Sequence, residues 1–192
     1  MKRLHMIFTS LLILAIAPMG AFAQVSFGNQ KGTVTLIEYF DYNCPVCRGY
    51  APTIDALAHK NHNLLVIQRV VPALAPTSSF VDRAVLASYF QGKFAQMQNA
   101  ILHVSNAETI SPKEVAEIAR SIGLNLKKLG HDMGSKSINK QIQENLSKWK
   151  KFHVRHIPVI VVYPTGHKNL RKEFVGAVPM AHLQTTINQF QK

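Results

Sequence analysis

Apolar and polar positions follow different periods along this chain, and the changes of period divide it into three parts. The stretches "VTLIEYF" (residues 34–40) and "LLVIQRVV" (64–71) are rich in β-branched and aromatic residues, and they predict buried strands. Between them, residues 45 to about 60 repeat apolar side chains with a helical period, Ile54, Leu57 and Ala58 sharing one face. The order strand, helix, strand predicts a right-handed crossover and a parallel strand pair.

The middle part, from residue 77 to about residue 151, keeps a helical period throughout. Its segment "SPKEVAEIARSIG" carries a helix start, because Ser111 can cap the helix, Pro112 suits its first position and Glu114 completes a capping box. Gly123 fits the stop. The other helical segments are "SFVDRAVLASYF", "GKFAQMQNAIL" and "SKSINKQIQENLSKWKKF".

The last part returns to strands. We predict a strand over residues 157–163, a turn at "PTG", a strand over 172–176 and a closing helix from about 179 to 190. The whole chain is therefore βαβ, an all-helical insertion, then ββα, which predicts an α/β fold.

The first residues have the composition of a secretory signal peptide. Lys2 and Arg3 precede a short apolar run that ends in Ala21-Phe22-Ala23. A membrane anchor is the alternative, but Pro18 and Gly20 cut the apolar run short of the roughly 20 residues that span a bilayer. We therefore expect cleavage after Ala23, a periplasmic location that permits disulfides, and a single mature domain over residues 24–192 with its helical insertion at about 77–151.

The chain is strongly basic, with a formal net charge of +12. Many of its cations lie between residues 127 and 172, where only Trp149 and Phe152 accompany the lysines at 148–151. Nucleic-acid binding favours interleaved aromatic side chains, and an exported protein meets little nucleic acid. A solvated basic face, near anionic lipid headgroups, is the preferred interpretation, and no nucleic-acid partner is expected.

The chain has two cysteines, Cys44 and Cys47, in the stretch "IEYFDYNCPVCRGYAP". A structural disulfide between them would close a very short loop and remove little entropy from the unfolded chain. A metal site remains an alternative, because His153 and His156 have a spacing that could complete a zinc site. The third alternative is a pair that exchanges electrons.

The position of Cys44 favours the redox alternative. Pro45 suits the first turn of a helix, so Cys44 falls at the N-cap, where backbone N–H groups and the helix dipole stabilise a thiolate. Its pKa should therefore lie below that of a free thiol. Cys47, one turn inside the helix, should be more buried and stay protonated. The spacing predicts an exposed nucleophile, Cys44, and a shielded resolving thiol, Cys47.

With "FDYNCPVCRGY" after a buried strand, the βαβ–insertion–ββα order, and a proline opening "IPVIVV", the chain resembles the DsbA family of exported thiol-disulfide oxidoreductases. The resemblance implies a thioredoxin fold with a helical insertion and a redox-active Cys44–Cys47 pair. It implies a cis peptide before Pro158 facing the cysteines, whereas the residues alone suggest an ordinary strand-entry proline. Substrate contacts would then fall to Ile157, Pro158, Pro45 and Val46.

Glu38 is open to two interpretations. A lone acid in an apolar strand is usually solvent-facing on an edge strand. The resemblance instead implies an acid beneath the active site that moves protons for Cys47. Two neighbours bear on the acidity of Cys44: Val46 replaces the histidine of the family's strong oxidants, and Arg48 either compensates in part or is an exposed helix residue.

We therefore expect a monomeric periplasmic oxidoreductase that donates disulfides to newly exported, cysteine-containing proteins. By resemblance, a quinone-linked, DsbB-like membrane partner would reoxidise the pair, and no metal or organic cofactor is needed. A disulfide isomerase or reductase is the alternative within this class. From another class, the alternative is a metal-binding protein that uses Cys44, Cys47, His153 and His156.

Overall fold

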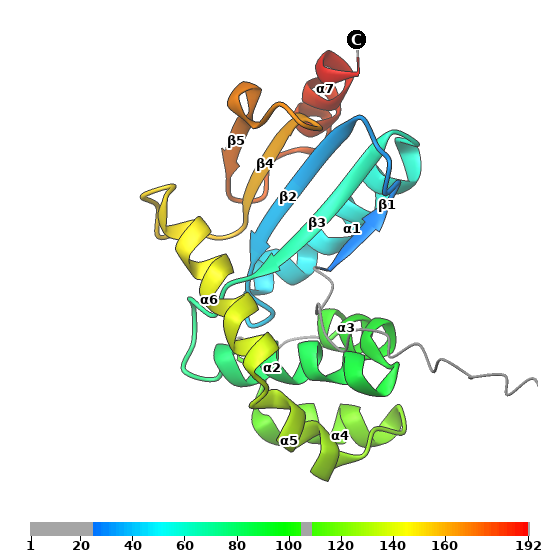
Figure 1. Ribbon diagram of the computed structural model, residues 1–192, viewed down its shortest axis with the longest axis vertical. Helices are drawn as coiled ribbons and strands as arrows, with labels where there is room; N and C mark the ends of the chain where they lie inside the picture. The colour runs from blue at the N-terminus through cyan, green and yellow to red at the C-terminus, as the bar shows by residue number, and fades with distance from the viewer. Residues whose placement is uncertain (1–24, 105–108, 192) are drawn as a thin grey trace, which may run out of the picture.

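A computed structural model describes residues 25–104 and 109–191, so the expected signal peptide lies outside the described residues. Its centre is a five-stranded sheet in the order β1-β3-β2-β4-β5 (Figure 1). β2 and β3 run parallel, as the crossover predicted, and the other neighbouring pairs are antiparallel. The strands are β1 (Ser26–Gly28), β2 (Val34–Phe40), β3 (Leu64–Val70), β4 (Val159–Pro164) and β5 (Lys172–Val175).

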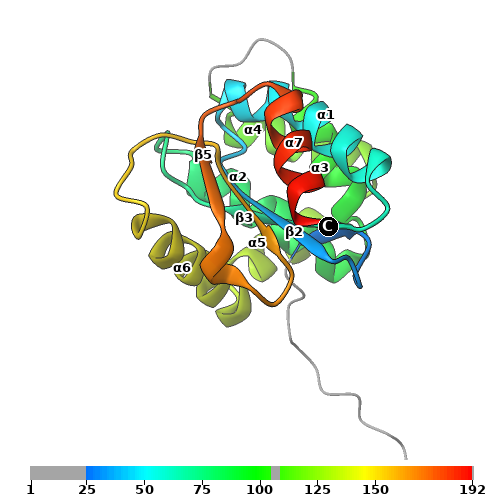
Figure 2. The same cartoon turned by 90° about the horizontal axis from the view of Figure 1, so that it is seen from above.

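Helices cover both faces of the sheet and one of its ends. Figure 2 shows α1 and α7 on one face and α6 on the other. The helices between β3 and β4 form the insertion, and the arrowheads of β2 and β3 point toward it (Figure 1). The helices are α1 (Pro45–Lys60), α2 (Ser78–Ala87), α3 (Phe94–Leu102), α4 (Pro112–Ser121), α5 (Leu126–Met133), α6 (Lys136–Lys150) and α7 (Met180–Phe190), with short 3-10 helices at Ser88–Gln91 and Lys168–Leu170.

The central strand β2 is buried along its whole length because both of its faces are covered. Leu36 packs in a cluster with Ile54 of α1 and Ile187 of α7. On the opposite face, Tyr39 packs with aromatic side chains at the end of α6, and its ring lies 5.3 Å from that of Phe152 in an edge-to-face arrangement. The continuous apolar run in the sequence reflects this two-sided burial.

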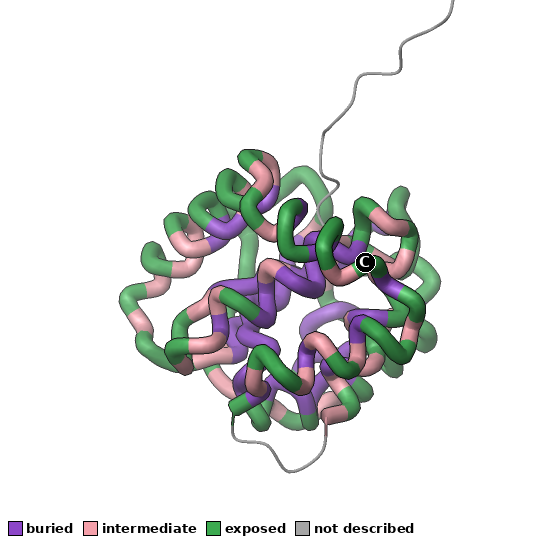
Figure 3. The backbone as a smooth tube through the Cα atoms, turned by 90° about the horizontal axis from the view of Figure 1, so that it is seen from below, coloured by how far each residue is buried: buried purple, intermediate pink, exposed green. Residues whose placement is uncertain are grey.

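The largest buried cluster joins the sheet to the insertion. It combines Phe40, the last residue of β2, and Tyr42, two residues further on, with apolar side chains from the insertion helices, including the fully buried Met97 and Ile101 of α3. Figure 3 shows such buried positions gathered on the inner sides of the elements. The insertion therefore shares one core with the sheet. Burying one side chain of this size stabilises the fold by about 1.5–3 kcal/mol.

The predicted helix start at Ser111 is confirmed, and both hydrogen bonds of its capping box with Glu114 are present. The sequence pattern missed two elements, β1 and α5. β1 has only three residues, and α5 is a short helix that Asn125 begins by accepting a hydrogen bond from the backbone of Lys128. Within residues 25–104 and 109–191, no helix has the length and apolar character needed to cross a bilayer.

Candidate active site

Cys44 occupies the N-cap of α1, as predicted. The chain leaves β2 at Phe40, turns through Asp41, Tyr42 and Asn43, and enters α1 at Pro45. Residues 41–44 are called the active-site loop below. Cys44 has an extended backbone (φ −80°, ψ 111°), and its Sγ accepts a hydrogen bond from the backbone N–H of Cys47 at 3.3 Å. The two thiols therefore meet at the first turn of a helix, where a negative charge is stabilised.

The predicted contrast in exposure between the two thiols is only partly correct. Cys47 is 1% exposed and Cys44 is 4% exposed, so Cys44 is the more accessible sulfur but not an exposed one. The physical reason is that both cysteines pack in the cluster shared with the insertion helices. The exposed residues are the two between them, Pro45 and Val46, and Val46 is 53% exposed.

The two sulfurs differ in acidity in the predicted direction. The hydrogen bond from the Cys47 thiol, aided by the backbone N–H groups of Cys47 and Val46, lowers the pKa of Cys44 from 9.0 to about 7, while burial and Asp41 oppose the shift. Burial, and next the hydrogen bond to Cys44, raise the pKa of Cys47. At neutral pH, Cys44 is therefore partly a thiolate and Cys47 remains a thiol.

Arg48 is not an exposed helix residue, which corrects one of the two sequence-based interpretations. Its side chain is 7% exposed, and Nη1 donates a hydrogen bond to the carbonyl oxygen of Tyr42 at 2.8 Å. Burial lowers the pKa of the guanidinium, whereas negative charge on Cys44 and Cys47 raises it, so the cation and a thiolate on the pair stabilise each other. Arg48 therefore holds the active-site loop and favours the thiolate.

Two loop residues that the sequence analysis did not single out anchor this site. The carboxylate of Asp41 accepts hydrogen bonds from the backbone N–H groups of Asn43, Ala73 and Leu74 at 2.8–3.0 Å. It thus ties the active-site loop to the segment that follows β3. Asp41 follows a buried strand directly and sits two residues before Asn43, a pattern typical of a side chain that organises a turn.

Asn43 ties the same loop to the insertion. Its side-chain nitrogen donates to the hydroxyl of Thr77 at 3.0 Å, and its side-chain oxygen accepts from the backbone N–H of Ile110 at 2.6 Å. A weaker bond reaches Ser78 at 3.4 Å. Since Asn43 is fully buried and out of reach of bulk water, the bonds fix the position of the loop against the insertion.

Glu38 is buried on the central strand, so the expectation of a solvent-facing acid on an edge strand was wrong. The alternating order of side chains puts it on the α1 face of β2, and it is 1% exposed. Its Oε2 accepts a hydrogen bond from the side chain of Gln68 on β3 at 2.9 Å. Burial raises the pKa of Glu38 from 4.5 to about 7, partly offset by the Gln68 bond and increased by the charges of Asp55 and Cys44.

The Ile157–Pro158 peptide is cis, as the resemblance implied. Antiparallel pairing sets Val159 beside Tyr39, so Pro158 lies at the end of the sheet from which the active-site loop leaves. Ile157 is half-buried and packs against the cluster that contains both cysteines. The structure therefore brings Pro158 and Ile157 to the side of the molecule that carries Pro45 and Val46.

The four residues of the alternative metal site do not form a cluster. His153 and His156 are both exposed in the segment between α6 and β4, whereas the cysteines are buried at the start of α1. Within the described part of the chain, no three His, Cys, Asp or Glu residues come together in a way that could hold a metal ion. The geometry thus gives the zinc alternative no support.

Comparison with known proteins agrees with this arrangement. The sequence profile of a family described as thioredoxin matches residues 22–176. The chain is 27% identical to the thiol:disulfide interchange protein DsbA of Burkholderia cepacia, over 70% of this chain and 66% of that relative, just under two thirds of its length.

Solved structures share the fold. A thioredoxin-like oxidoreductase from Silicibacter pomeroyi DSS-3 superposes with a TM-score of 0.77 at 28% identity, covering 88% of this chain and 92% of the other. The thiol-disulfide exchange protein alpha-DsbA2 from Wolbachia pipientis gives 0.73 at 20% identity, covering 86% of each chain. The α/β fold with a helical insertion that the sequence predicted is therefore confirmed.

Proposed function

This chain belongs to the thioredoxin family, as its resemblance to DsbA proteins predicted, and we propose that it is a thiol-disulfide oxidoreductase that works through Cys44 and Cys47. The observation that carries the proposal is the unequal pair at the start of α1. Cys44 receives an N–H hydrogen bond and a depressed pKa, and Cys47 keeps its proton. Such a pair has one sulfur suited to attack or departure and one suited to resolve a mixed disulfide.

The proposed reaction moves two electrons from a substrate dithiol to the enzyme disulfide. A substrate thiolate attacks the sulfur of Cys44, the Cys44–Cys47 bond breaks, and Cys47 leaves and takes up a proton. A second substrate thiolate then attacks the substrate sulfur of the mixed disulfide, and Cys44 leaves as a thiolate. The substrate gains a disulfide and the enzyme becomes a dithiol. Stabilisation of the Cys44 thiolate favours this direction, because it makes Cys44 a good leaving group.

We assign the proton for Cys47 to Glu38. A leaving group with a raised pKa needs a proton donor, and a carboxyl group with a pKa of about 7 is protonated often enough near neutral pH to supply one. The negative charge of Glu38 also raises the pKa of Cys47, so the two groups lie close enough to interact. In the reverse reaction the carboxylate accepts the same proton.

The substrate surface that we propose is formed by the exposed Pro45 and Val46 and the half-buried Ile157, next to the buried Pro158. Val46 stands between the two cysteines in the sequence, and its exposed side chain offers apolar contact to an unfolded chain. The backbone before Pro158 lies at the end of the sheet that holds the active-site loop, where an extended substrate segment can pair with it as an added strand.

In the cell, we propose that the protein acts as a periplasmic monomer that donates disulfides to newly exported proteins and is reoxidised by a DsbB-like membrane partner, with no metal or organic cofactor. The lowered pKa of Cys44 supports this direction of electron flow, because it stabilises the dithiol and so makes the disulfide oxidising. An isomerase or reductase would use the same residues but be held reduced.

The test has two parts. The purified oxidised protein, mixed with a reduced peptide that contains two cysteines, should convert one equivalent of peptide to its disulfide. Cys44→Ser should abolish the transfer. Reduced Cys47→Ser, mixed instead with the disulfide form of the peptide, should accumulate a mixed disulfide at Cys44, because the variant lacks the resolving thiol. Disulfide transfer by Cys44→Ser would contradict the mechanism. Thiol trapping in cells then gives the direction: a mostly oxidised pair supports a disulfide donor, and a mostly reduced pair supports an isomerase or reductase.

A further inference from the structure

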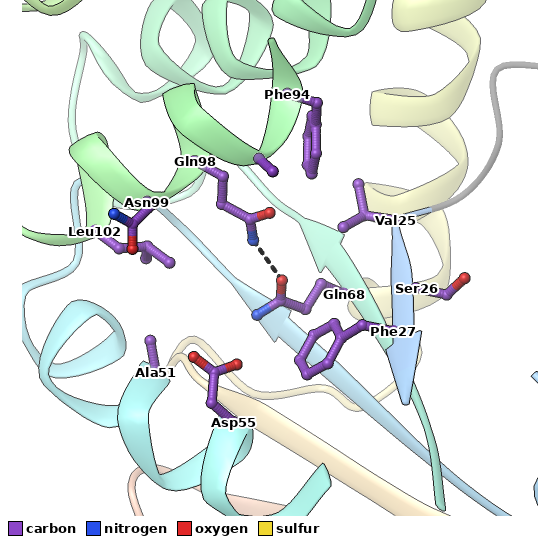
Figure 4. A pocket seen from close by; sticks show the side chains of 11 residues that line it. Val25, Ser26, Phe27, Ala51, Asp55, Gln68, Phe94, Gln98, Asn99 and Leu102 are labelled. Carbon is purple, nitrogen blue, oxygen red and sulfur yellow. Dashed lines mark hydrogen bonds between the residues drawn. The ribbon is translucent and has the colours of Figure 1, made fainter. Parts of the chain in front are cut away.

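A short chain of side-chain amides connects Glu38 to the insertion. Glu38 and Gln68 are partners in the register of β2 and β3, so their side chains lie next to each other on the same face of the sheet. The Nε2 of Gln68 donates to the carboxylate of Glu38 at 2.9 Å. In turn, the Nε2 of Gln98, on α3, donates to the Oε1 of Gln68 at 2.6 Å (Figure 4).

The direction of these bonds follows from the chemistry of an amide, which has one donor end and one acceptor end. Gln68 is 4% exposed, and both of its polar ends are engaged, the oxygen by Gln98 and the NH₂ group by Glu38. Because Gln98 presents its NH₂ group to the oxygen of Gln68, the NH₂ group of Gln68 must face Glu38. As long as Gln98 offers its NH₂ group, Gln68 therefore offers its own NH₂ group to the carboxylate.

Gln98 reaches Gln68 across an open cavity between α1, β1, β3 and α3. The cavity has a volume of about 330 Å³, and Figure 4 shows Asp55 of α1 and Phe27 of β1 on its walls. This is room for on the order of ten water molecules. Gln98 is half-exposed there, so its side chain can be changed without disturbing a packed core.

We propose that Gln98 is a positioning residue for the redox reaction: it holds Gln68 as a hydrogen-bond donor to Glu38, so that an inserted helix keeps that carboxyl group ionisable. The proposal rests on the proton-transfer role proposed above for Glu38. A donor stabilises the carboxylate, whereas an amide turned to present its oxygen would stabilise only the protonated acid.

Other groups near Glu38 act on the same carboxyl group. Asp55 on α1 and Cys44 at the N-cap of that helix raise its pKa through their negative charge. Glu38 in turn raises the pKa of Tyr50 on α1 and of Tyr42 in the active-site loop, and it raises that of Cys47. Within the described residues, the hydrogen bond from Gln68 opposes these charges and lowers the pKa of Glu38.

The test uses Gln98→Glu to reverse the direction of the hydrogen bonds that run from residue 98 through Gln68 to Glu38. The new carboxylate accepts from the NH₂ group of Gln68, so the oxygen of Gln68 turns to Glu38 and the protonated acid is favoured. The pKa of Glu38, followed by its ¹³C carboxyl shift in the oxidised protein, should rise by at least about one unit, a tenfold gain in proton affinity. Gln68→Leu, which removes the donor outright, should also raise it.

Asn99→Asp is the matched control for charge. Asn99 lies on the same helix and lines the same cavity, but none of its described hydrogen bonds reaches Gln68. It should shift the pKa of Glu38 by less than a third of the change in Gln98→Glu. Gln98→Met keeps the length of the side chain without its donor and should give an intermediate rise. Circular dichroism and thermal unfolding confirm that each variant is folded.

The outcomes separate this inference from the proposed function. Equal shifts in Gln98→Glu and Asn99→Asp, or none in either, would overturn the positioning role of Gln98. A shift confined to Gln98→Glu supports it. If that shift occurs and the pH profile of disulfide exchange moves upward with it, both proposals stand. If the pKa of Glu38 moves and the profile does not, Gln98 positions Gln68 as proposed but Glu38 does not supply the proton.

Discussion

The stability of the reduced protein should depend on pH through the ionisation of Cys44. The oxidised protein should lack this dependence, because its Cys44 is in a disulfide and does not ionise. The thiol has a pKa lowered from 9.0 to about 7 by the Cys47 thiol and the N–H groups at the start of α1. A group with a depressed pKa stabilises the fold fully above its unfolded pKa and loses that contribution as the pH falls through its folded pKa. The window therefore extends from about pH 9 down to pH 7 and slightly below.

The size of the effect follows from these two values. Two pKa units correspond to about 2.7 kcal/mol at full ionisation, about 1.4 kcal/mol at pH 8, about 0.4 kcal/mol at pH 7 and almost nothing at pH 6. Cys47, whose pKa is raised, opposes this only when its unfolded form ionises, near pH 9 and above. The reduced protein should gain about 1.3 kcal/mol over the oxidised protein between pH 6 and pH 8.

Urea denaturation of both redox forms at pH 6, 7 and 8 measures this difference, with circular dichroism or the fluorescence of the single tryptophan, Trp149, as the signal. The disulfide itself contributes about 2 kcal/mol of loop entropy to the oxidised form, but that term does not depend on pH and cancels. Reduced Cys44→Ala serves as the control and should lack the extra slope. A difference between redox forms that stays constant within about 0.3 kcal/mol from pH 6 to pH 8 would refute a stabilised thiolate at Cys44.

Three further predictions concern single side chains. Cys47→Ala removes the largest contribution to the low pKa of Cys44, so the thiolate absorbance at 240 nm should titrate at higher pH, and an unchanged midpoint would assign the acidity to the backbone alone. Asn43→Ala removes the hydrogen bonds between the active-site loop and the insertion, and it should lower the free energy of unfolding, measured by urea denaturation, by about 2–3 kcal/mol. A loss of less than about 0.5 kcal/mol would show that these bonds do not hold the loop to the insertion. Asp82 is fully buried in α2 and burial raises its pKa, so its ionisation lowers the stability of the fold above the unfolded pKa near 4. Asp82→Asn should therefore be more stable than the wild type at pH 7 and nearly equal to it at pH 3. A less stable variant at pH 7 would show that the carboxylate has a favourable partner.

Local features of this site could be predicted because they depend on neighbours in the sequence. The N-cap position of Cys44 needs only the proline that follows and the turn before it, and the capping box of α4 needs only four consecutive residues. The two parallel strands were also predictable, since their apolar runs are long and a helix separates them. The two caps have a physical cause that acts within a few residues, and the strand pair joins neighbouring elements of the sequence.

The burial of single polar side chains was not predictable in the same way. Whether Glu38 lies on an edge or a central strand depends on β4, which pairs with β2 from more than a hundred residues away in the sequence. Arg48 is buried and donates to the carbonyl oxygen of Tyr42, and the helical pattern of the sequence gives no sign of either feature. The accessible area of Cys44 is likewise set by the insertion helices that pack over the cluster. Such features depend on contacts distant in sequence.

The core that holds both cysteines also contains side chains from the insertion helices, and this has a consequence for how the molecule opens. Sub-global opening of the insertion would expose the thiols along with the apolar residues that cover them, so the two regions should belong to one cooperative unit in native-state hydrogen exchange. Amides of α3 and amides of the first turn of α1 should then exchange with similar opening free energies. A shortened chain without the insertion would lose one side of the thiol environment, so the insertion cannot be treated as a removable module.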